Sequence, residues 1–473
     1  MTNDQTAILQ DLMFHTVPGD LGGKLDDFRA EMARDYAGAS EAGKAEIAET
    51  IAESAIDLRS VLPAWNLQNA DRHGASVVTD AQLDEQFEAN LALLGELGAR
   101  AETQRVQAEA AALAASNLVR LTRMTLAGEL NTYWGNDYAS GLRKAMQRGA
   151  ILVTTNPVLV DIARKEAPEY WTPVRDALQA RLGAQCDPVT LAYAMTIQVV
   201  VHNANLLRPI WEITGGRLGY VSLQLNPKEA SNADTMVEEA SWVYAQLEDE
   251  LGGVPNTVFK IPATAAGIPA GERMTAKGMG VNVTVNFSLP QQIAFAGAIE
   301  ANSTAPVSFR TQMDGRLDDP VGEELEEAGV ADWEEVKKWA TTAVRQRDVG
   351  ILCEPPAKGG LGFKKSFPLG ASGRGSWNIE RGTNNGETPL FITIFPDKVE
   401  DYDSQPREID PDGIWTELPD GYLDKLMKSR IFRQAYEPDG MEPEEFIDFV
   451  PSARTLKQFG EAYDEFLQWV CGA

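Results

Sequence analysis

A single lysine interrupts an apolar run that has the composition of a buried strand. Lys260 lies in the run 258–262 (VFKIP), between aromatic and β-branched residues. Burial removes water from an ammonium group, which favours the neutral amine and lowers the pKa of the lysine. A neutral amine is a nucleophile toward a carbonyl carbon, so Lys260 is a candidate for Schiff-base chemistry. The alternative is a lysine at a strand end whose ammonium group reaches solvent.

Two other runs alternate polar and apolar residues with a period of two. They cover residues 221–226 (VSLQLN) and 281–287 (VNVTVNF). Strands covered on both faces are normally apolar, and an unpaired buried amide or hydroxyl costs about 1–3 kcal/mol. We therefore expect the polar residues to face the axis of a barrel and to form hydrogen bonds there; exposed antiparallel strands are the alternative. These polar positions are Ser222, Gln224, Asn226, Asn282, Thr284 and Asn286.

These runs belong to a part of the chain in which β-rich runs alternate with helical patterns. Strands separated by helices pair in parallel, and about eight such units over roughly 270 residues fit a closed (β/α)8 TIM barrel. We predict this α/β fold, with a doubly wound open sheet as the alternative. The segment 354–375, rich in Gly, Pro and Lys, is expected to be a long loop near one mouth of the barrel. The expected strands are 130–134, 151–155, 220–225, 257–262, 281–287, 307–313 and 390–395, with 367–372 or 349–353 as the eighth.

Helical patterns flank the barrel on both sides. Apolar residues recur at helical spacing over 46–59 and 81–124, and the alanine-rich block 102–115 indicates a strong helix former more than a close-packed helix interface. Further helical patterns follow residue 400, at 422–435, 444–449 and 456–470. We therefore divide the chain into an N-terminal helical extension (1–126), a catalytic barrel (127–400) and C-terminal helices packed on the barrel (401–473).

The composition excludes several classes of protein. The 42 Lys and Arg against 70 Asp and Glu give a net charge of −28, which disfavours binding to nucleic acid or to an anionic membrane. No apolar run reaches the ~20 residues of a membrane span, and the N-terminus lacks the features of a signal peptide, so we expect a cytoplasmic protein. The three cysteines and three histidines are too scattered for a disulfide framework or a zinc site.

The residues around Lys260 resemble the transaldolase family, including its smaller fructose-6-phosphate aldolase relatives. The run 260–264 (KIPAT) is similar to the motif that carries the Schiff-base lysine, and 278–288 (GMGVNVTVNFS) is similar to the strand that follows it. The runs 154–160 (TTNPVLV) and 435–441 (AYEPDGM) and the pair Asn136-Asp137 also resemble the family. The resemblance covers about residues 130–396 and leaves the residues before 126 unexplained.

The resemblance implies a class I aldol mechanism that needs no metal and no organic cofactor, since the lysine itself provides the electron sink. Lys260 would attack the ketose carbonyl and Asp137 would exchange protons with the substrate hydroxyls. Thr284 would position the catalytic water. The residues that would bind the substrate are Asn156, Asn282 and Thr311 at the dihydroxyacetone portion, and Arg316, Ser372 and Arg374 at the phosphate, with a sulfonate as the alternative anion.

Several of these residues also have a plain structural interpretation. Asp137 could cap a helix over 138–148, and Asn156 could form a turn before Pro157. Thr311, which stands where the family usually has serine, retains the hydroxyl. The two arginines could instead form ion pairs with one of three nearby carboxylates, Asp314, Asp318 and Glu380.

Two positions depart from the family pattern. Gln224 stands where transaldolases proper have glutamate, and an amide can orient a water but cannot accept its proton. The aldolase relatives have glutamine there, but they have tyrosine at the position of Met313.

We therefore expect a transferase that moves dihydroxyacetone between sugar phosphates in carbohydrate metabolism of the pentose phosphate type. The alternatives are an aldolase-like lyase that needs no aldehyde acceptor and a non-catalytic sugar-phosphate-binding protein. The N-terminal helices are expected to serve packing and homo-oligomer formation.

Overall fold

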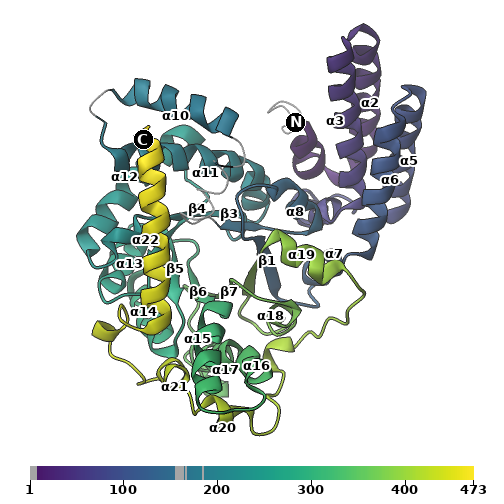
Figure 1. The fold of residues 1–473 in the computed structure, drawn as a ribbon. Helices are drawn as coiled ribbons and strands as arrows, with labels where there is room; N and C mark the ends of the chain where they lie inside the picture. The colour runs from purple at the N-terminus through teal and green to yellow at the C-terminus, as the bar shows by residue number, and fades with distance from the viewer. Residues whose placement is uncertain (1–7, 155–164, 166–167, 184–185, 473) are drawn as a thin grey trace.

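The computed structural model describes residues 8–154, 165, 168–183 and 186–472. Within these residues, eight parallel strands pair in sequence order and close into a barrel, with β1 next to β8 (Figure 1). The predicted TIM barrel is confirmed, and the open doubly wound sheet and the antiparallel sheet are excluded. The strands are β1 (Thr132–Asn136), β2 (Leu152–Thr154), β3 (Tyr220–Gln224), β4 (Thr257–Pro262), β5 (Gly280–Asn286), β6 (Phe309–Met313), β7 (Phe367–Ala371) and β8 (Leu390–Ile394).

The first of the two candidates for the eighth strand is correct. Residues Phe367–Ala371 form β7, whereas Val349–Cys353 form a π-helical turn, η6. The predicted loop 354–375 is therefore wrong in its last part, because β7 pairs there between β6 and β8. Gly370 reads as a loop residue in the sequence, but a side chain at this strand position would overlap the guanidinium group of Arg345.

Helices surround the barrel, and the main apolar core lies between them and the outward faces of the strands. Leu223, Phe259 and Val283 are buried in this core together with residues of α11, α12 and α13. The helices between the strands are α8 (Leu142–Arg148), α10 (Pro168–Leu182), α11 (Pro188–Ile213), α12 (Ala233–Leu251), α13 (Gly267–Ala276), α14 (Leu289–Asn302), α15 (Asp314–Glu327), α16 (Trp333–Val336), α17 (Ala340–Asp348) and α18 (Ser376–Glu380).

The inside of the barrel is apolar at its amino end and polar at its carboxyl end. Near the amino end, the ring centroid of Phe391 lies 5.4 Å from that of Tyr133, 4.9 Å from that of Phe309 and 6.0 Å from that of Phe367. Thr311 and Thr393 follow Phe309 and Phe391 at the next inward-facing positions. The aromatic layer therefore forms a floor beneath the polar residues and excludes water from that side.

The prediction for Asn286 is wrong. The register of β5 against β6 shifts between Val283 and Asn286, and Val285 has a left-handed φ of 52°. This bulge adds one residue, so Asn286 lies opposite Gln312, whose amide donates outward to Thr341 O. The alternation of polar and apolar residues continues unbroken through 281–287, so the sequence carries no sign of the bulge.

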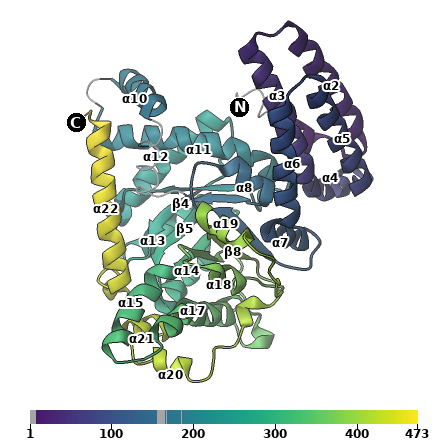
Figure 2. The same ribbon diagram turned by 45° about the vertical axis from the view of Figure 1, so that its right-hand side comes forward.

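The N-terminal helices form a bundle beside the barrel (Figure 2). The predicted helix 81–124 is three helices, because the chain turns after residue 96 and again at Ser116, whose hydroxyl caps the last of them. In α6 only Val106 and Leu113 are buried, so its alanines act as helix formers, as predicted. The bundle and its connection to the barrel comprise α2 (Leu21–Gly38), α3 (Glu41–Arg59), α4 (Asn66–His73), α5 (Asp80–Glu96), α6 (Arg100–Ala115) and α7 (Asn117–Leu126).

A buried ion pair joins this bundle to the barrel. Asp57 of α3 is fully buried and accepts hydrogen bonds from Arg143 and from Gln147 Nε2 (2.9 Å), both in α8. Burial raises the pKa of Asp57 to about 6, against the opposing effect of Arg143. Because α8 directly follows the loop after β1, the bundle is attached next to a part of the barrel where active-site residues are expected.

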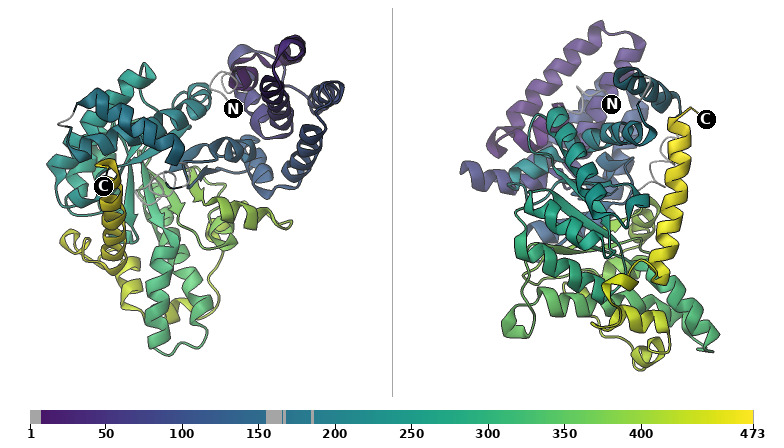
Figure 3. Two further views of the ribbon diagram at one scale, coloured as in Figure 1. Left: turned by 45° about the horizontal axis from the view of Figure 1, so that its top comes forward. Right: turned by 90° about the vertical axis from the view of Figure 1, so that its left-hand side faces the viewer.

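The C-terminal segment wraps around the barrel and ends in one long helix. The predicted helix 422–435 is interrupted before Ser429, whose hydroxyl caps the next helix, and the predicted helix 444–449 is only a short turn at Pro443–Glu445. The long helix α22 packs against α11, α15 and β5 along one side of the molecule (Figure 3). None of the described helices is both long and apolar enough to cross a bilayer. The helices are α19 (Pro396–Asp403), α20 (Tyr422–Leu426), α21 (Arg430–Tyr436) and α22 (Val450–Val470).

Candidate active site

Lys260 lies inside the carboxyl half of the barrel. It belongs to β4, its strand neighbours are Gln224 on β3 and Asn282 on β5, and it is only 6% exposed. Burial lowers the pKa of Lys260 to about 8, although the nearby charge of Asp137 acts in the opposite direction. The interpretation as a solvent-reaching lysine is therefore wrong, and a substantial fraction of the amine is neutral near pH 8.

Asp137 lies at the carboxyl end of β1 and faces the same space. Its backbone N–H donates to Ile394 O (3.0 Å), which continues the pairing with β8, and its side chain accepts a hydrogen bond from the Thr154 hydroxyl. Helix α8 begins at Leu142 with Gly141 at its N-cap, so the capping role considered for Asp137 is wrong. The carboxylate is buried and lies close enough to affect the pKa of Lys260.

Three polar side chains form a chain of hydrogen bonds across neighbouring strands. The Thr311 hydroxyl donates to Asn282 Oδ1, and Asn282 Nδ2 donates to Ser222 Oγ (3.0 Å). Both contacts fix the orientation of the Asn282 amide, because its oxygen must accept and its nitrogen must donate. The prediction of a hydrogen-bonding interior is thus confirmed for these residues.

Gln224 and Thr284 lie at the carboxyl ends of their strands. Gln224 Nε2 donates to Leu225 O (3.2 Å), while its Oε1 is buried and has no hydrogen-bond partner among the described residues. This oxygen can accept a proton donor such as a water or a substrate hydroxyl. The Thr284 hydroxyl lies 3.5 Å from Met313 Sδ. Asn226 lies past the end of β3 and accepts from Lys228 N (3.1 Å), so it does not line the interior as predicted.

Arg316 lies in the first turn of α15, directly after β6, and Arg374 lies in the loop after β7. Arg316 Nη1 donates to Gln458 Oε1 (2.6 Å) in α22, and Arg374 Nη2 lies 3.1 Å from Asp319 Oδ2. Burial and the charge of Arg374 both lower the pKa of Arg316, so two cations lie near each other at this end of the barrel. The carboxylates considered as partners bind other groups: Asp314 pairs with Arg345, Asp318 accepts from Thr341, and Glu380 pairs with Arg407.

Ser372 is the first residue of the loop after β7, and its backbone has a left-handed conformation. Its φ is 58°, which is unfavourable for a residue with a side chain, and its carbonyl accepts hydrogen bonds from Gly315 N (3.2 Å) and Arg374 Nη1 (3.1 Å). The start of α15 and the loop after β7 are therefore held together next to the two arginines. Asn156, the remaining predicted substrate-binding residue, lies outside the described residues.

Two hydroxyl residues of the interior were missed in the sequence. Thr154 donates to Asp137, and Thr393 faces Gly135 across β1 and β8 with a buried hydroxyl that has no partner in the part of the chain described. Thr154 begins the run 154–160, so its position carried a signal. Thr393 is a single hydroxyl within an apolar strand and carried none.

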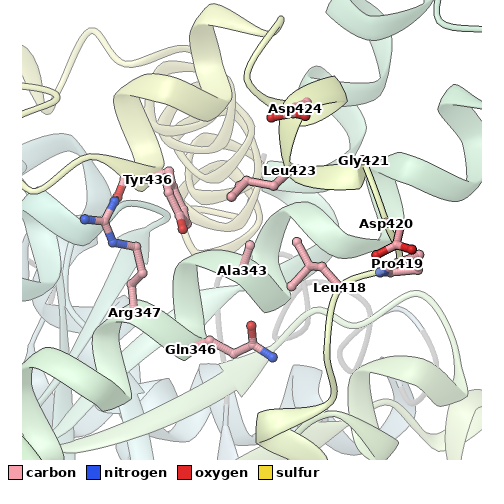
Figure 4. Close-up of a pocket in the computed structure, with 10 residues that line it drawn as sticks. All are labelled: Ala343, Gln346, Arg347, Leu418, Pro419, Asp420, Gly421, Leu423, Asp424 and Tyr436. Carbon is pink, nitrogen blue, oxygen red and sulfur yellow. The ribbon is translucent and has the colours of Figure 1, made fainter.

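A separate hollow of about 450 Å³ lies outside the barrel, between α17, α20 and α21 (Figure 4). Two of its polar lining groups already have partners: Arg347 pairs with Glu437 and lies over the ring of Tyr436, and Gln346 donates to two backbone carbonyls. None of the predicted site residues lines it. The chemistry is therefore expected inside the barrel and not in this hollow.

Comparisons with known proteins agree with this geometry. A family profile described as Transaldolase/Fructose-6-phosphate aldolase matches residues 140–352. The chain is 32% identical over 201 residues to "Transaldolase 1" of Streptomyces avermitilis, which covers 40% of this chain and 51% of the relative. It is 34% identical over 155 residues to "Transaldolase" of Thermobifida fusca, covering 33% and 40% of the two chains.

A third relative, "Transaldolase" of Neisseria meningitidis serogroup C, is 29% identical over 216 residues, covering 41% of this chain and 59% of the relative. The chain thus matches about half of the length of these curated relatives. The matched region contains β2 to β6, and therefore Lys260, Asn282 and Thr311. Residues 140–352 of the chain are thus similar to the transaldolase/fructose-6-phosphate aldolase family.

Proposed function

We propose that this protein is a Schiff-base enzyme that transfers a dihydroxyacetone unit between sugar phosphates, in carbohydrate metabolism of the pentose phosphate type. The observation that carries this proposal is the buried Lys260 amine, with its pKa lowered to about 8, beside the Asp137 carboxylate. The match to the family over residues 140–352 and the similarity to proteins named transaldolase support it.

The first step forms a covalent bond between enzyme and donor. The neutral Lys260 amine attacks the ketone carbon of the donor, and the carbinolamine then loses water to give an iminium ion. The floor of aromatic rings beneath Lys260 keeps bulk water away from this centre on one side. The positive iminium nitrogen then provides the electron sink for the next step.

The second step breaks the bond between C3 and C4 of the donor. Asp137 accepts the proton of the C4 hydroxyl, the electrons of the C3–C4 bond pass into the iminium group, and an aldose leaves. The enamine that remains attacks the aldehyde carbon of an acceptor, and Asp137 returns the proton to the new hydroxyl. Hydrolysis of the resulting iminium ion, with a water positioned by Thr284, frees Lys260.

The other site residues hold the donor in place. Asn282 and Thr311 lie next to Lys260 and are assigned to the hydroxyls of the three-carbon unit, with Asn156 as a third ligand. Arg316, Ser372 and Arg374 are assigned to the phosphate, because guanidinium groups present forked donors to its oxygens. Loops after the late strands of a TIM barrel are a recurrent phosphate site.

A lyase that releases dihydroxyacetone without an acceptor is the second candidate, and Gln224 favours it. The buried Oε1 of this amide can orient a water but cannot take its proton at neutral pH. The balance between transfer and release therefore depends on how well water is activated at this position.

The products formed from fructose 6-phosphate test these two candidates. With erythrose 4-phosphate as acceptor, we expect transfer to exceed the release of free dihydroxyacetone, and we expect Gln224→Glu to raise transfer further. Equal release with and without acceptor would support the lyase. An unchanged ratio in Gln224→Glu would show that this residue does not control the outcome.

A further inference from the structure

We propose that Asp314 is a positioning residue. Through Asn378, it holds the start of α15, which carries Arg316, and the loop after β7, which carries Arg374, in the geometry that binds the donor's phosphate. This inference rests on the proposed function in one respect, since it takes Arg316 and Arg374 as phosphate ligands. It adds two residues that do not themselves touch the substrate.

Asp314 is the first residue of α15 and is almost completely buried. It follows the last residue of β6 and precedes Gly315 and Arg316 in the chain. One carboxylate oxygen accepts a hydrogen bond from Arg345 of α17, and the other accepts from Asn378 Nδ2 of α18 (3.0 Å). Both oxygens therefore have charged or amide donors, as a buried carboxylate requires.

Asn378 links Asp314 to the loop after β7. Its Oδ1 accepts hydrogen bonds from Arg374 N (2.8 Å) and Gly375 N (3.3 Å). The oxygen of the Asn378 amide accepts hydrogen bonds and its nitrogen donates them. Because the Asp314 carboxylate can only accept, Nδ2 must face Asp314 and Oδ1 must face the loop after β7. The backbone of Arg374 is thus positioned from the start of α15 through a single buried side chain, that of Asn378.

The start of α15 and the loop after β7 also meet through their backbones. Gly315 N donates to Ser372 O (3.2 Å), and a side chain on Gly315 would overlap that of Arg374. The left-handed Ser372 is a conformation that persists only where its surroundings impose it. The hydrogen bonds of Asn378 with Arg374 N and Gly375 N, together with that of Gly315 N to Ser372 O, supply that constraint.

The position of Arg374 depends strongly on this backbone support. Its side chain is 43% exposed, and its ion pair joins it to Asp319, which is itself 45% exposed. An exposed ion pair of this kind contributes little to fixing a long side chain. Anchoring of the Arg374 backbone therefore determines how well its guanidinium group is preorganised for a phosphate.

Asp348 provides a matched control. It is also buried and also pairs with an arginine, Arg310, on the outer face of β6. Its hydrogen bond with Arg310 involves neither the start of α15 nor the loop after β7, which form the proposed phosphate site. Replacing it removes a buried carboxylate of the same kind from the same side of the barrel.

The test compares the donor concentrations that half-saturate borohydride trapping on Lys260. In Asp314→Asn the new amide nitrogen must face either Arg345 or Asn378, and one hydrogen bond is lost because both of these groups are donors. In Asn378→Ala the link between Asp314 and the loop after β7 is lost. For each variant we expect the half-saturating concentration of fructose 6-phosphate to rise about tenfold. For dihydroxyacetone, which has no phosphate, we expect a change of less than about twofold.

Further measurements separate positioning from a general loss of structure. The Asp314→Asn, Asn378→Ala double variant should be no worse than the poorer single variant, because the two residues act in one chain of contacts. Asp348→Asn should leave the ratio of the two half-saturating concentrations unchanged. Equal shifts for both donors, or the same split in Asp348→Asn, would overturn the inference. Absence of any adduct on Lys260 in the wild type would overturn the proposed function, and this inference with it.

Discussion

At the scale of single residues, the sequence located the buried lysine of the barrel interior and most of its polar neighbours. Lys260 stands out because a charge within a buried strand is costly and needs a reason. Asn282 follows from alternation along its strand, whereas Thr311 was given only by the family resemblance. Asn286 could not be placed correctly, since one residue with a left-handed backbone at Val285 reverses the faces of the strand. Thr393 could not be identified as an interior polar residue, because a single hydroxyl within an apolar strand produces no pattern in the sequence.

The pH dependence of Schiff-base formation tests the environment of Lys260. Burial lowers the pKa of this lysine to about 8, so the rate of trapping should rise with pH through a midpoint near 8 and not above 10. In Asp137→Asn the charge that opposes this shift is gone, so the midpoint should move to lower pH. Trapping rates measured with dihydroxyacetone between pH 6 and 10 check this. A midpoint that Asp137→Asn leaves in place would show that the carboxylate does not act on the amine.

At the scale of elements, the barrel strands were predictable because each is a short β-rich run separated from the next by a helical pattern. The helix over 81–124 was predicted as one element, since apolar spacing continues across its breaks and only local caps such as Ser116 separate the three helices. The attachment of the bundle through Asp57 and Arg143 was not predictable, because it joins residues 86 positions apart.

That attachment predicts a large loss of stability in Asp57→Ala. The variant leaves Arg143, which is only 15% exposed, without its nearest carboxylate, and we expect the free energy of unfolding to fall by about 3 kcal/mol. Asp84→Ala is the control, because Asp84 is 60% exposed in its pair with Arg59. We expect this variant to lower the free energy of unfolding by less than about 1 kcal/mol. Urea unfolding at pH 7.5 measures both values. Equal losses would show that the buried pair does not hold the bundle.

At the scale of the whole molecule, buried carboxylates make stability depend on pH. Burial raises the pKa of Asp318 to about 7 from an ordinary 3.8, although Thr341 donates to it twice. The folded protein therefore binds this proton more tightly than the unfolded chain does. The stability that it contributes is present at low pH and is lost as the pH rises through 7. This effect depends on three-dimensional burial, so the sequence could not predict it.

Asp318→Asn should make the molecule less sensitive to pH in this range. The amide is neutral throughout and can still accept from Thr341, so the fall in unfolding free energy between pH 5 and 8 should shrink by on the order of 2 kcal/mol. Urea unfolding at several pH values checks this. A fall as steep in Asp318→Asn as in the wild type would mean that Asp318 ionises normally in the folded protein.

The most direct test of the account is to locate the covalent adduct formed with fructose 6-phosphate. The protein is incubated with the sugar phosphate and borohydride, digested, and analysed by peptide mass spectrometry. We predict a mass gain on the peptide containing Lys260, its loss in Lys260→Met, and its persistence in Lys277→Met, where an exposed lysine is replaced. An unmodified Lys260 peptide, or an adduct that persists in Lys260→Met, would contradict the proposed chemistry.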